Sequence, residues 1–585
     1  MTSPYDTYTS PLASRNASPA MLKLWSARHK FNTWRRIWLA VAEAQHEVTK
    51  DWGKGEGEGG GGGPLPDGRG SSGPLVTKAQ VEALRAVVER GITDAEMARA
   101  TELERELRHD VMAHVHCLGE SCPEAKGIIH LGCTSQDVVC NADIIIMRSA
   151  VELVEYKLVR AIVDLGLQGK KSASVPTVGW THYQTAQPVT VGRRLCGWAS
   201  DLRLCLNRIG WNESGTLRDY LNLKGFRGAT GTQASFLSLF DGDGDMVDEF
   251  EIRTAIRVGC RNVLEEIGSI DRDDIENTRA ANVAHHRSEA ERYAAVGDQE
   301  HASIARECAE ELAQKTLDQL VHEHIEMGLG YVQGLVGQTY PRVVDAFLLA
   351  DLAGIAAVLH KIATDIRLLS NRKELDEPFG DKQIGSSAMP YKRNPMKCER
   401  ICGLTRFVMN LVGNAYDTAA TQWLERTLDD SSNRRLSLPE AFLALDGALD
   451  LMHEVASGLV VHEAMVRKNL MAELPFLATE NILMAAVRAG GDRQELHEKI
   501  RVHAQAAGMR VKQEGLENDL IERLRADPAF ASVHHLLTED ALLDPMQYVG
   551  RSVEQTARFV DEVVEPLRVR YEEELRELGS SDRGV

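Results

Sequence analysis

The chain has 585 residues, of which 43% are hydrophobic and 26% charged. This composition is ordinary for a soluble globular protein, and the length predicts more than one hydrophobic core. Acidic residues outnumber Lys and Arg by 86 to 67, which gives a formal net charge of −19 at pH 7. Such a charge argues against a protein that coats nucleic acid or an anionic membrane, although it permits a local basic pocket for a small anion.

The cysteines and the apolar stretches indicate where the protein resides. Ten cysteines are spread along the chain without the spacing of a disulfide framework, a zinc knuckle or a redox motif. The N-terminus has no apolar signal core, and the most apolar stretch, residues 346–366, contains Asp351, Lys361 and Asp365. We therefore expect free thiols, no metal site, no membrane-spanning segment and a cytoplasmic location.

The first break in the chain is residues 53–73, where 11 of 21 residues are glycine. Ordering such a run costs too much conformational entropy, so a mobile loop is predicted. A glycine-rich phosphate loop is the alternative, but no strand precedes the run and no Gly-Lys-Ser/Thr ends it. Residues 78–116 then show apolar residues at three- and four-residue steps, which predicts helix.

Long helices are predicted for the middle and the end of the chain. Residues 342–371 carry one broad apolar stripe without proline, which predicts about eight turns of a bundle helix. Residues 551–578 repeat the pattern, with a kink expected at Pro566. Strand patterns are few, and the short candidates lie within residues 174–191. The predicted fold class is therefore all-α, with long helices packed as a bundle.

Residues 246–314 differ from their surroundings. They are rich in Arg, Glu, Asp and Ala and contain few large apolar residues. A solvated or partly disordered helical insertion is therefore predicted. His285, His286 and His301 lie in this segment, but their spacing does not favour a metal site.

Residues 385–395 carry the most specific motif, Gly-Ser-Ser-Ala-Met-Pro-Tyr-Lys-Arg-Asn-Pro. Gly-Ser-Ser starts a hydroxyl-rich loop, and the two prolines restrict its exit. Lys392 and Asn394 place a cation and an amide at alternate positions, which suits them to bind a carboxylate. Gly-Ser-Ser alone would more often be an ordinary surface turn.

Three further polar segments could carry chemistry. In residues 179–188, His182 is surrounded by hydroxyl and amide side chains, which favours proton exchange although a lone histidine is more often structural. In residues 107–114, an Arg-His-Asp sequence could bind an anion or simply cover a helix surface. Residues 425–435 combine three arginines with hydroxyl groups, as in a phosphate site, although a solvated charged turn is the alternative.

Taken together, these segments carry a resemblance to a known family. Residues 385–394 resemble the signature loop of the fumarase/aspartase superfamily, and the other motifs narrow the resemblance to the adenylosuccinate lyases. The supporting positions agree in order and spacing; they are residues 11–15, 108–110, 134–135, 181–182, 337–340, Arg400, 425–435, 473–476 and 512–515. Only residues 53–73 and 246–314 fall outside the resemblance.

The resemblance implies a three-domain, all-α fold with a central long-helix bundle assembled in a homotetramer. The domains would be an N-terminal helical domain at 1–134, a central bundle domain at 135–461 and a C-terminal helical domain at 462–585. Each active site would take residues from three chains.

The resemblance also implies the reaction. The family releases fumarate by β-elimination from adenylosuccinate, giving AMP, and from the succinylated ribotide SAICAR, giving AICAR, in purine nucleotide biosynthesis. One group must remove a proton from the carbon beside a carboxylate, and another must protonate the departing nitrogen. Cations and hydrogen-bond donors must stabilise the dianionic intermediate. No metal and no cofactor is expected, and the expected partners are nucleotide substrates, with neither nucleic acid nor a membrane.

Residue roles follow from the resemblance by position. Ser386 would be the general base, and His182 the general acid, oriented by Glu399. Lys392 would hold the carboxylate whose charge grows. The residues expected to bind the substrate are Arg15, Asn16, Arg108, His109, Asp110, Thr134, Ser135, Gln338, Asn394, Arg400, Arg426, Ser431 and Arg435.

Two positions depart from the family pattern. Asn16 stands where a tyrosine is common, so a phenol contact to phosphate would be lost. The motif after Ser135 commonly ends in Asp-Asn or Asp-Thr, whereas this chain has Cys140 and Asn141. The alternatives are another fumarate-releasing enzyme, such as an argininosuccinate lyase, and a non-catalytic scaffold. The arginine-rich segment favours a nucleotide over the first, and the presence of the catalytic side chains argues against the second.

Overall fold

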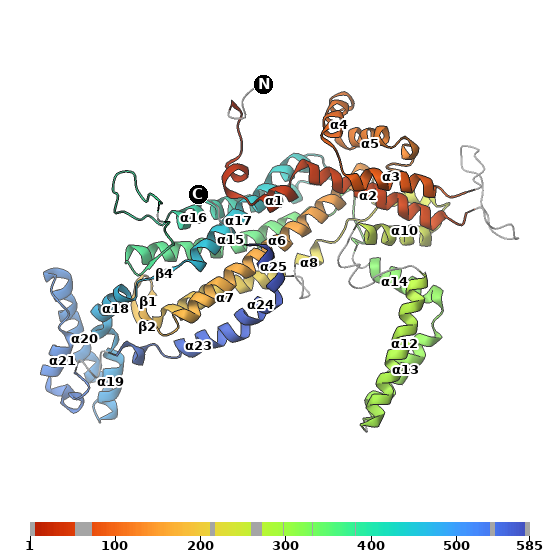
Figure 1. The fold of residues 1–585 in the computed structure, drawn as a ribbon. Helices are drawn as coiled ribbons and strands as arrows, with labels where there is room; N and C mark the ends of the chain where they lie inside the picture. Colours follow the sequence, from red (N-terminus) through yellow and green to blue (C-terminus); the bar gives the residue numbers. More distant parts are fainter. Residues whose placement is uncertain are drawn as a thin grey trace.

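The computed structural model describes residues 6–52, 73–210, 217–258, 272–296, 298–329, 332–380, 382–538 and 544–579. Helices dominate this part of the chain, which confirms the all-α prediction. They form an elongated bundle with smaller helical parts at its two ends (Figure 1). The predicted glycine-rich loop, apart from Gly73, lies outside the described residues.

The N-terminal part is helical, as its periodicity predicts. A π-helical turn, η2, leads into short and long helices that pack beside the bundle. The bounds are η2 Leu12–Asn16, α1 Pro19–Leu24, α2 Ala27–Thr49, α3 Lys78–Arg90, α4 Asp94–Leu107 and α5 Asp110–Ser121. Thr77 and Thr93 cap α3 and α4 with complete capping boxes, which explains why these helices begin where they do.

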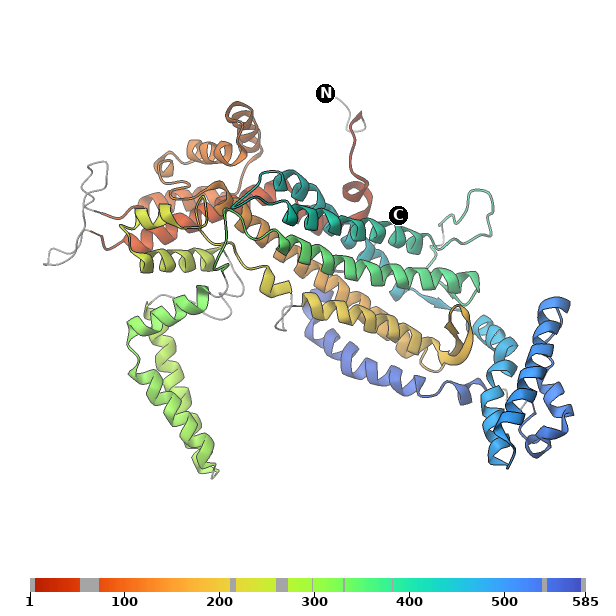
Figure 2. The same ribbon diagram turned by 180° about the vertical axis from the view of Figure 1, so that it is seen from behind.

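Five long helices form the central bundle and enclose the main core (Figure 2). They are α6 Ser135–Lys171, α7 Val191–Ile209, α15 Val343–Asn371, α16 Met396–Ala420 and α17 Asp430–Ser457. The predicted helix at 342–371 is thus confirmed as α15. The 37 residues of α6 are buried on most sides and extend for about 55 Å at 1.5 Å per residue.

Helix α15 and the combined α18–α19 segment are long and apolar enough to cross a membrane by length and composition alone. In α15, Leu352, Ile355 and Leu359 are fully buried, and the helix packs against α7, α16 and α17. Burial of an apolar helix inside a bundle accounts for the composition of α15.

The predicted strands form a hairpin between α6 and α7. Strand β1, Pro176–Thr181, pairs antiparallel with β2, Gln184–Thr190. The pair Thr181 and Gln184 leaves only His182 and Tyr183 in the turn. A second two-stranded pair joins β3, Leu375–Asp376, to β4, Val460–Val461, at the same end of the bundle.

The C-terminal region has two parts. Helices α18 Glu463–Leu477, α19 Thr479–Arg488, α20 Arg493–Met509 and α21 Leu520–Ala526 are the first, with a separate small core over residues 478–537. Helices α23 Ser552–Phe559, α24 Glu565–Arg570 and α25 Glu572–Glu577 then return along the bundle and pack against α6. A π-helical turn at Val560–Val564 separates α23 from α24, and the kink expected at Pro566, within α24, stays a prediction.

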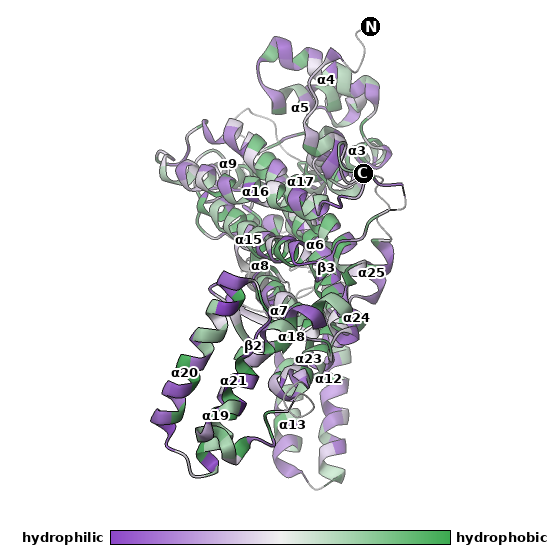
Figure 3. Ribbon diagram, turned by 90° about the vertical axis from the view of Figure 1, so that its left-hand side faces the viewer, coloured by the Kyte–Doolittle hydropathy of each residue, from purple (hydrophilic) through white to green (hydrophobic). Residues whose placement is uncertain are grey.

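The prediction of a solvated segment at 246–314 is wrong for its first part. Helix α10, Gly244–Arg257, packs against α2 and buries Phe250, whose ring stacks on Phe236 at 4.9 Å. The dense charge concealed this burial, because a charged residue such as Arg253 is itself buried on α10, where it pairs with Glu47 at 2.8 Å. Helices α12 Arg272–Ala295 and α13 Gln299–Gln314 instead form a hairpin that extends away from the bundle, on the same side as α19–α21 (Figure 3).

The short helices α8 Leu217–Tyr220, α9 Ala234–Leu239 and α14 Leu317–Leu329 complete the described elements of the central region.

Candidate active site

The predicted site residues fall into three groups at different places on one chain. The first group, the α6 N-terminal cluster, surrounds the start of α6. It comprises Arg108, His109, Asp110, Thr134, Ser135, Gln338, Arg426, Ser431 and Arg435. Arg435 donates to Asp110 at 2.7 Å, Arg426 donates to Gln338 at 2.8 Å, and the Ser135 hydroxyl lies 3.4 Å from the His109 ring. Segments more than 300 residues apart in the sequence therefore meet here.

The start of α6 is fixed by its own capping residues. Thr134 is the N-cap, and its backbone N–H donates to Asp137 at 2.8 Å. The second oxygen of Asp137, fully buried, accepts from Lys224 and from the backbone N–H groups of Arg227 and Gly228. Asp137 thus holds the Thr134 segment against the loop at 224–228.

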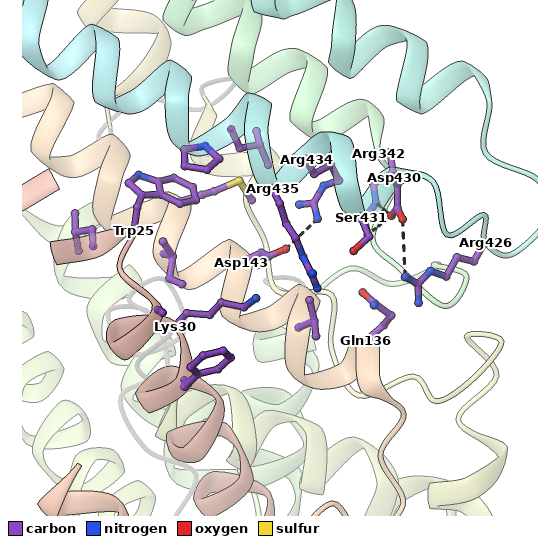
Figure 4. A pocket seen from close by; sticks show the side chains of 18 residues that line it. Trp25, Lys30, Gln136, Asp143, Arg342, Arg426, Asp430, Ser431, Arg434 and Arg435 are labelled. Carbon is purple, nitrogen blue, oxygen red and sulfur yellow. Dashed lines mark hydrogen bonds and ion pairs between the residues drawn. The ribbon is translucent and has the colours of Figure 1, made fainter. Parts of the chain in front are cut away.

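A cavity of about 280 Å³ opens into this cluster (Figure 4). Gln136, Arg426, Ser431 and Arg435 line one side of it, and the rest of the wall includes apolar side chains such as Trp25. A cavity with a cationic, hydroxyl-bearing wall and an apolar wall suits a phosphorylated ligand that carries a flat ring.

The arginines at this cavity differ in burial and in how far neighbouring carboxylates balance their charge. Arg434 is buried and its guanidinium contacts Asp345 at 2.5 Å and Asp143 at 2.9 Å, so its charge is already balanced. Arg435 has 55% of its side chain exposed and pairs with Asp110 at 2.7 Å. Partial burial opposes ionisation of Asp110, yet the Arg435 guanidinium, the Val111 backbone N–H and the Lys30 ammonium together lower the pKa of that carboxyl. The exposed Arg435 guanidinium can therefore leave the Asp110 carboxylate and bind the anionic group of a ligand instead.

The second group belongs to the signature loop and the N-terminal segment. It comprises Arg15, Asn16, Ser386, Lys392, Asn394, Glu399 and Arg400. Asn394 donates to the Gly385 carbonyl at 2.9 Å, and the Ser386 hydroxyl accepts from the Met389 backbone N–H at 3.2 Å. A Cβ on Gly385 would lie 2.1 Å from the Lys392 carbonyl, so only glycine allows this loop closure.

Helix α16 holds the end of that loop. Buried Glu377 accepts from the backbone N–H groups of Lys397 and Cys398, each at 3.0 Å, and so caps the start of α16. Glu399, one turn into the helix, lies 3.9 Å from Arg367. In the described part of one chain, Glu399 makes no hydrogen bond to His182, so the predicted orientation of His182 by Glu399 does not occur within a single subunit.

Arg15 and Asn16 line a larger cavity of about 1010 Å³ together with Arg400 and Lys382. Both lie in the turn η2, which packs on α17. The Asn16 amide donates back to the Pro11 carbonyl at 3.0 Å.

His182 is the third group by itself. It occupies the tip of the β1–β2 hairpin, where His182 and Tyr183 are exposed and have φ of 53° and 55°. Two consecutive left-handed residues define a turn that usually contains Asn and Gly, so His-Tyr is a strained choice. The hairpin follows the C-terminal end of α6, so about 55 Å of helix separates it from Ser135.

Sequence reasoning missed several residues of the first group. Gln136 lines the cavity directly beside the predicted Ser135, and position alone could have identified it. Lys30 lines the same cavity, where burial lowers the pKa of its ammonium, but no motif surrounds it in the sequence. The departure at Cys140 is buried: its thiol lies 3.1 Å from the Gln136 amide and accepts from Arg342 at 3.8 Å, where an aspartate would bring a charge.

Comparison with known proteins identifies the family. A sequence model described as "Adenylosuccinate lyase C-terminus" matches residues 475–559, and one described as "Lyase" matches residues 68–236 and 278–410. The adenylosuccinate lyase of Saccharomyces cerevisiae is 40% identical over 560 residues, covering 96% of this chain and 95% of the yeast protein. The Schizosaccharomyces pombe enzyme is also 40% identical, with 96% and 95% covered, and the Schistosoma mansoni enzyme is 36% identical, with 96% and 96% covered. The chain belongs to the adenylosuccinate lyase family.

Solved structures agree on the fold of this lyase. A fumarate lyase from Mesorhizobium superposes with a TM-score of 0.65 at 19% identity and covers 95% of this chain and 99% of its own. A 3-carboxy-cis,cis-muconate lactonizing enzyme from Pseudomonas putida gives a TM-score of 0.65 at 22% identity and covers 95% and 98%. At these identities the likeness concerns the fold alone, and it confirms the predicted superfamily architecture of the subunit. The "Lyase" match is interrupted between residues 236 and 278, which includes the start of the predicted insertion.

Proposed function

We propose that the enzyme cleaves adenylosuccinate to AMP and fumarate, and SAICAR to AICAR and fumarate. The observation that carries this proposal is the cavity at the α6 N-terminal cluster, where Ser431 lies between Arg426 and Arg435 in a chain of the adenylosuccinate lyase family. Charge-assisted bonds from arginine suit a phosphate, and the apolar wall suits a base. Argininosuccinate carries no phosphate, so these arginines would have no phosphate to bind in an argininosuccinate lyase.

The chemistry takes place on the succinyl part of the substrate. Ser386 would remove the proton from the carbon beside a carboxylate, which requires an alkoxide-like hydroxyl. Lys392 and Asn394 would then stabilise the dianion that develops on that carboxylate. His182 would deliver a proton to the departing nitrogen, so that the carbon–nitrogen bond breaks and fumarate leaves. The electron pair left on carbon forms the carbon–carbon double bond of fumarate, and the pair of the broken carbon–nitrogen bond stays on the nitrogen that His182 protonates.

The remaining assignments concern binding. Thr134, Ser135 and Gln338 would hold the succinyl part of the substrate. Arg15, Arg426, Ser431 and Arg435 would hold the phosphate and ribose. Asn16, Arg108, His109, Asp110 and Arg400 would complete the pocket.

We propose that the enzyme assembles as a homotetramer, and the distances within one chain support a site built from several copies. No nucleotide spans the length of α6, so His182 and the α6 N-terminal cluster of one subunit cannot act on the same substrate molecule. A complete site then needs residues from different subunits. Exposed apolar side chains on the bundle helices offer the surface for this assembly; Leu204 on α7 is 65% exposed and Leu436 on α17 is 66% exposed. Glu399 would orient His182 across such an interface.

The proposed partners are therefore nucleotide substrates and other copies of the chain, and the proposed location is the cytoplasm. The test is a continuous assay of adenylosuccinate cleavage by purified tetramer, with argininosuccinate as the control substrate. Cleavage of the first alone supports the proposal. Cleavage of argininosuccinate, or of neither compound, would refute it.

A further inference from the structure

Asp446 lies inside the bundle and joins the N-terminal segment to two central helices. Its side chain on α17 is fully buried, and its oxygens accept from the Ser18 backbone N–H at 2.5 Å and from the Ser18 hydroxyl at 3.0 Å. Lys157 of α6 donates to Asp446 and also to Asp450, the latter at 2.9 Å. Arg160 donates to Asp450 at 2.8 Å, so two cations balance two carboxylates in one buried network.

Packing alone does not require these charges. Apolar side chains of similar volume would fill the same space without the desolvation cost of a buried ion pair. They could not, however, accept a hydrogen bond from the backbone N–H of Ser18, which is itself buried. The Ser18 hydroxyl meanwhile accepts from the Met21 backbone N–H at 3.2 Å and caps α1. Asp446 therefore fixes the residue at which the N-terminal segment enters the bundle.

The path from Ser18 to the substrate-binding segment is short and constrained. Ala17 is buried and extended, and it directly follows Asn16, the last residue of the turn η2. Gly447, next to Asp446 on α17, touches this turn: a Cβ at Gly447 would lie 2.6 Å from the Asn16 carbonyl oxygen. The α17 backbone at Gly447 thus limits how closely the turn η2 approaches the bundle. The buried network around Asp446 fixes the position of Ser18, where the chain leaves that turn.

We propose that Asp446, held by Lys157, is a positioning residue for the segment that carries Arg15 and Asn16, and that Gly447 supplies the close contact beneath it. This inference rests on the proposed substrate-binding role of that segment. Asp446 contacts no substrate in this arrangement, so its loss should weaken binding and leave the chemical step nearly unchanged.

The first test is Asp446→Asn in the full-length tetramer. Asparagine keeps the size of the side chain but has a single acceptor oxygen, so it cannot serve both Ser18 and Lys157 as before. We expect KM for adenylosuccinate to rise about tenfold with kcat nearly constant, as for the loss of one or two hydrogen bonds. A merely structural role would lower Tm and leave KM unchanged, and that result would overturn the proposal.

The second test, Gly447→Ala, leaves every ionic group in place and therefore remains informative if Asp446→Asn fails to fold. The added methyl group must displace Asn16, so KM should rise here too. Gly508→Ala on α20 is the matched control, because a Cβ at Gly508 meets nothing within 4 Å. Its KM should stay at the wild-type value. An unchanged KM in Gly447→Ala tetramers would overturn the inference.

Arg15→Ala distinguishes a failure of the positioning role of Asp446 from a failure of the proposed substrate-binding role of Arg15. If Arg15→Ala raises KM while Asp446→Asn and Gly447→Ala do not, the proposed site survives and the positioning inference fails. If Arg15→Ala leaves KM unchanged, the substrate-binding role of Arg15 is wrong and the inference falls with it.

Discussion

Subunit mixing provides the sharpest test of a site shared between chains. His182→Ala removes the proposed acid, and the double change Arg426→Ala with Arg435→Ala removes the proposed phosphate site. In one chain these positions lie at opposite ends of α6, a separation of about 55 Å for 37 residues. Each variant alone should be inactive, but a mixed tetramer can combine an intact His182 from one chain with intact arginines from another.

The expected recovery follows from random assembly. Half of the chains supply an intact His182 and half supply intact arginines, so about one quarter of the sites contain both. Activity measured as adenylosuccinate cleavage should therefore return to roughly a quarter of the wild-type value after subunit exchange. Ser386→Ala mixed with His182→Ala should recover to the same extent if these residues also come from different chains.

A matched control uses two positions from the same end of one chain. His109→Ala mixed with the double arginine variant should stay inactive, because both lesions affect the α6 N-terminal cluster and no chain in the mixture carries it intact. Native mass spectrometry must show that mixed tetramers form. Mixed tetramers of His182→Ala and the arginine variant that remain inactive would refute the shared site.

Three further outcomes are expected. Ser386→Ala and His182→Ala should each lower kcat by roughly 10²–10⁴ while Tm stays near the wild-type value; near-normal turnover would remove the residue from the catalytic pair. Arg435→Ala should raise KM by one to two orders of magnitude, at about 1.5–3 kcal/mol for a charge-assisted bond, whereas a fall in Tm with an unchanged KM would indicate a structural role. Burial outweighs the nearby Arg227 and raises the pKa of Glu251 from 4.5 to about 7. Between these two pH values the Glu251 carboxyl is protonated in the folded state and ionised in the unfolded state. The free energy of unfolding should therefore decrease as pH rises from about 4.5 to 7. The span is worth about 3 kcal/mol, and Glu251→Gln should flatten the dependence of Tm on pH; an equally steep dependence in this variant would exclude Glu251 as its cause.

The sequence predicted the bundle helices well because their apolar periodicity directly reflects burial. Residues 342–371 became α15 with nearly the same bounds, and the candidates at 174–191 became the β1–β2 hairpin. Helix α10 was missed as a core element for a physical reason. Arg253 is buried and stays charged by pairing with Glu47, so overall composition concealed the buried face that carries Phe250.

The sequence motifs select candidate site residues, but they do not give their arrangement. Motif order identified Arg435, Ser386 and His182, yet nothing in the sequence places them in three separate groups. That separation comes from the length and straight course of α6, which only tertiary structure reveals. Gln136 and Lys30 were missed because a cavity is formed by side chains from several helices, and no local pattern marks them.

The left-handed turn at His182 and Tyr183 has an energetic consequence. Holding two non-glycine residues in this conformation costs roughly 1–2 kcal/mol each, and in one chain the tip is solvent-exposed, with the Tyr183 ring 5.4 Å from that of Trp180. A free hairpin would therefore populate other turn shapes for much of the time. The His182 imidazole would gain a fixed orientation when another surface encloses the tip, so contacts between subunits would restrict the motion of the proposed acid. Amide hydrogen exchange at the tip should then slow on association, while exchange within α6 should stay the same.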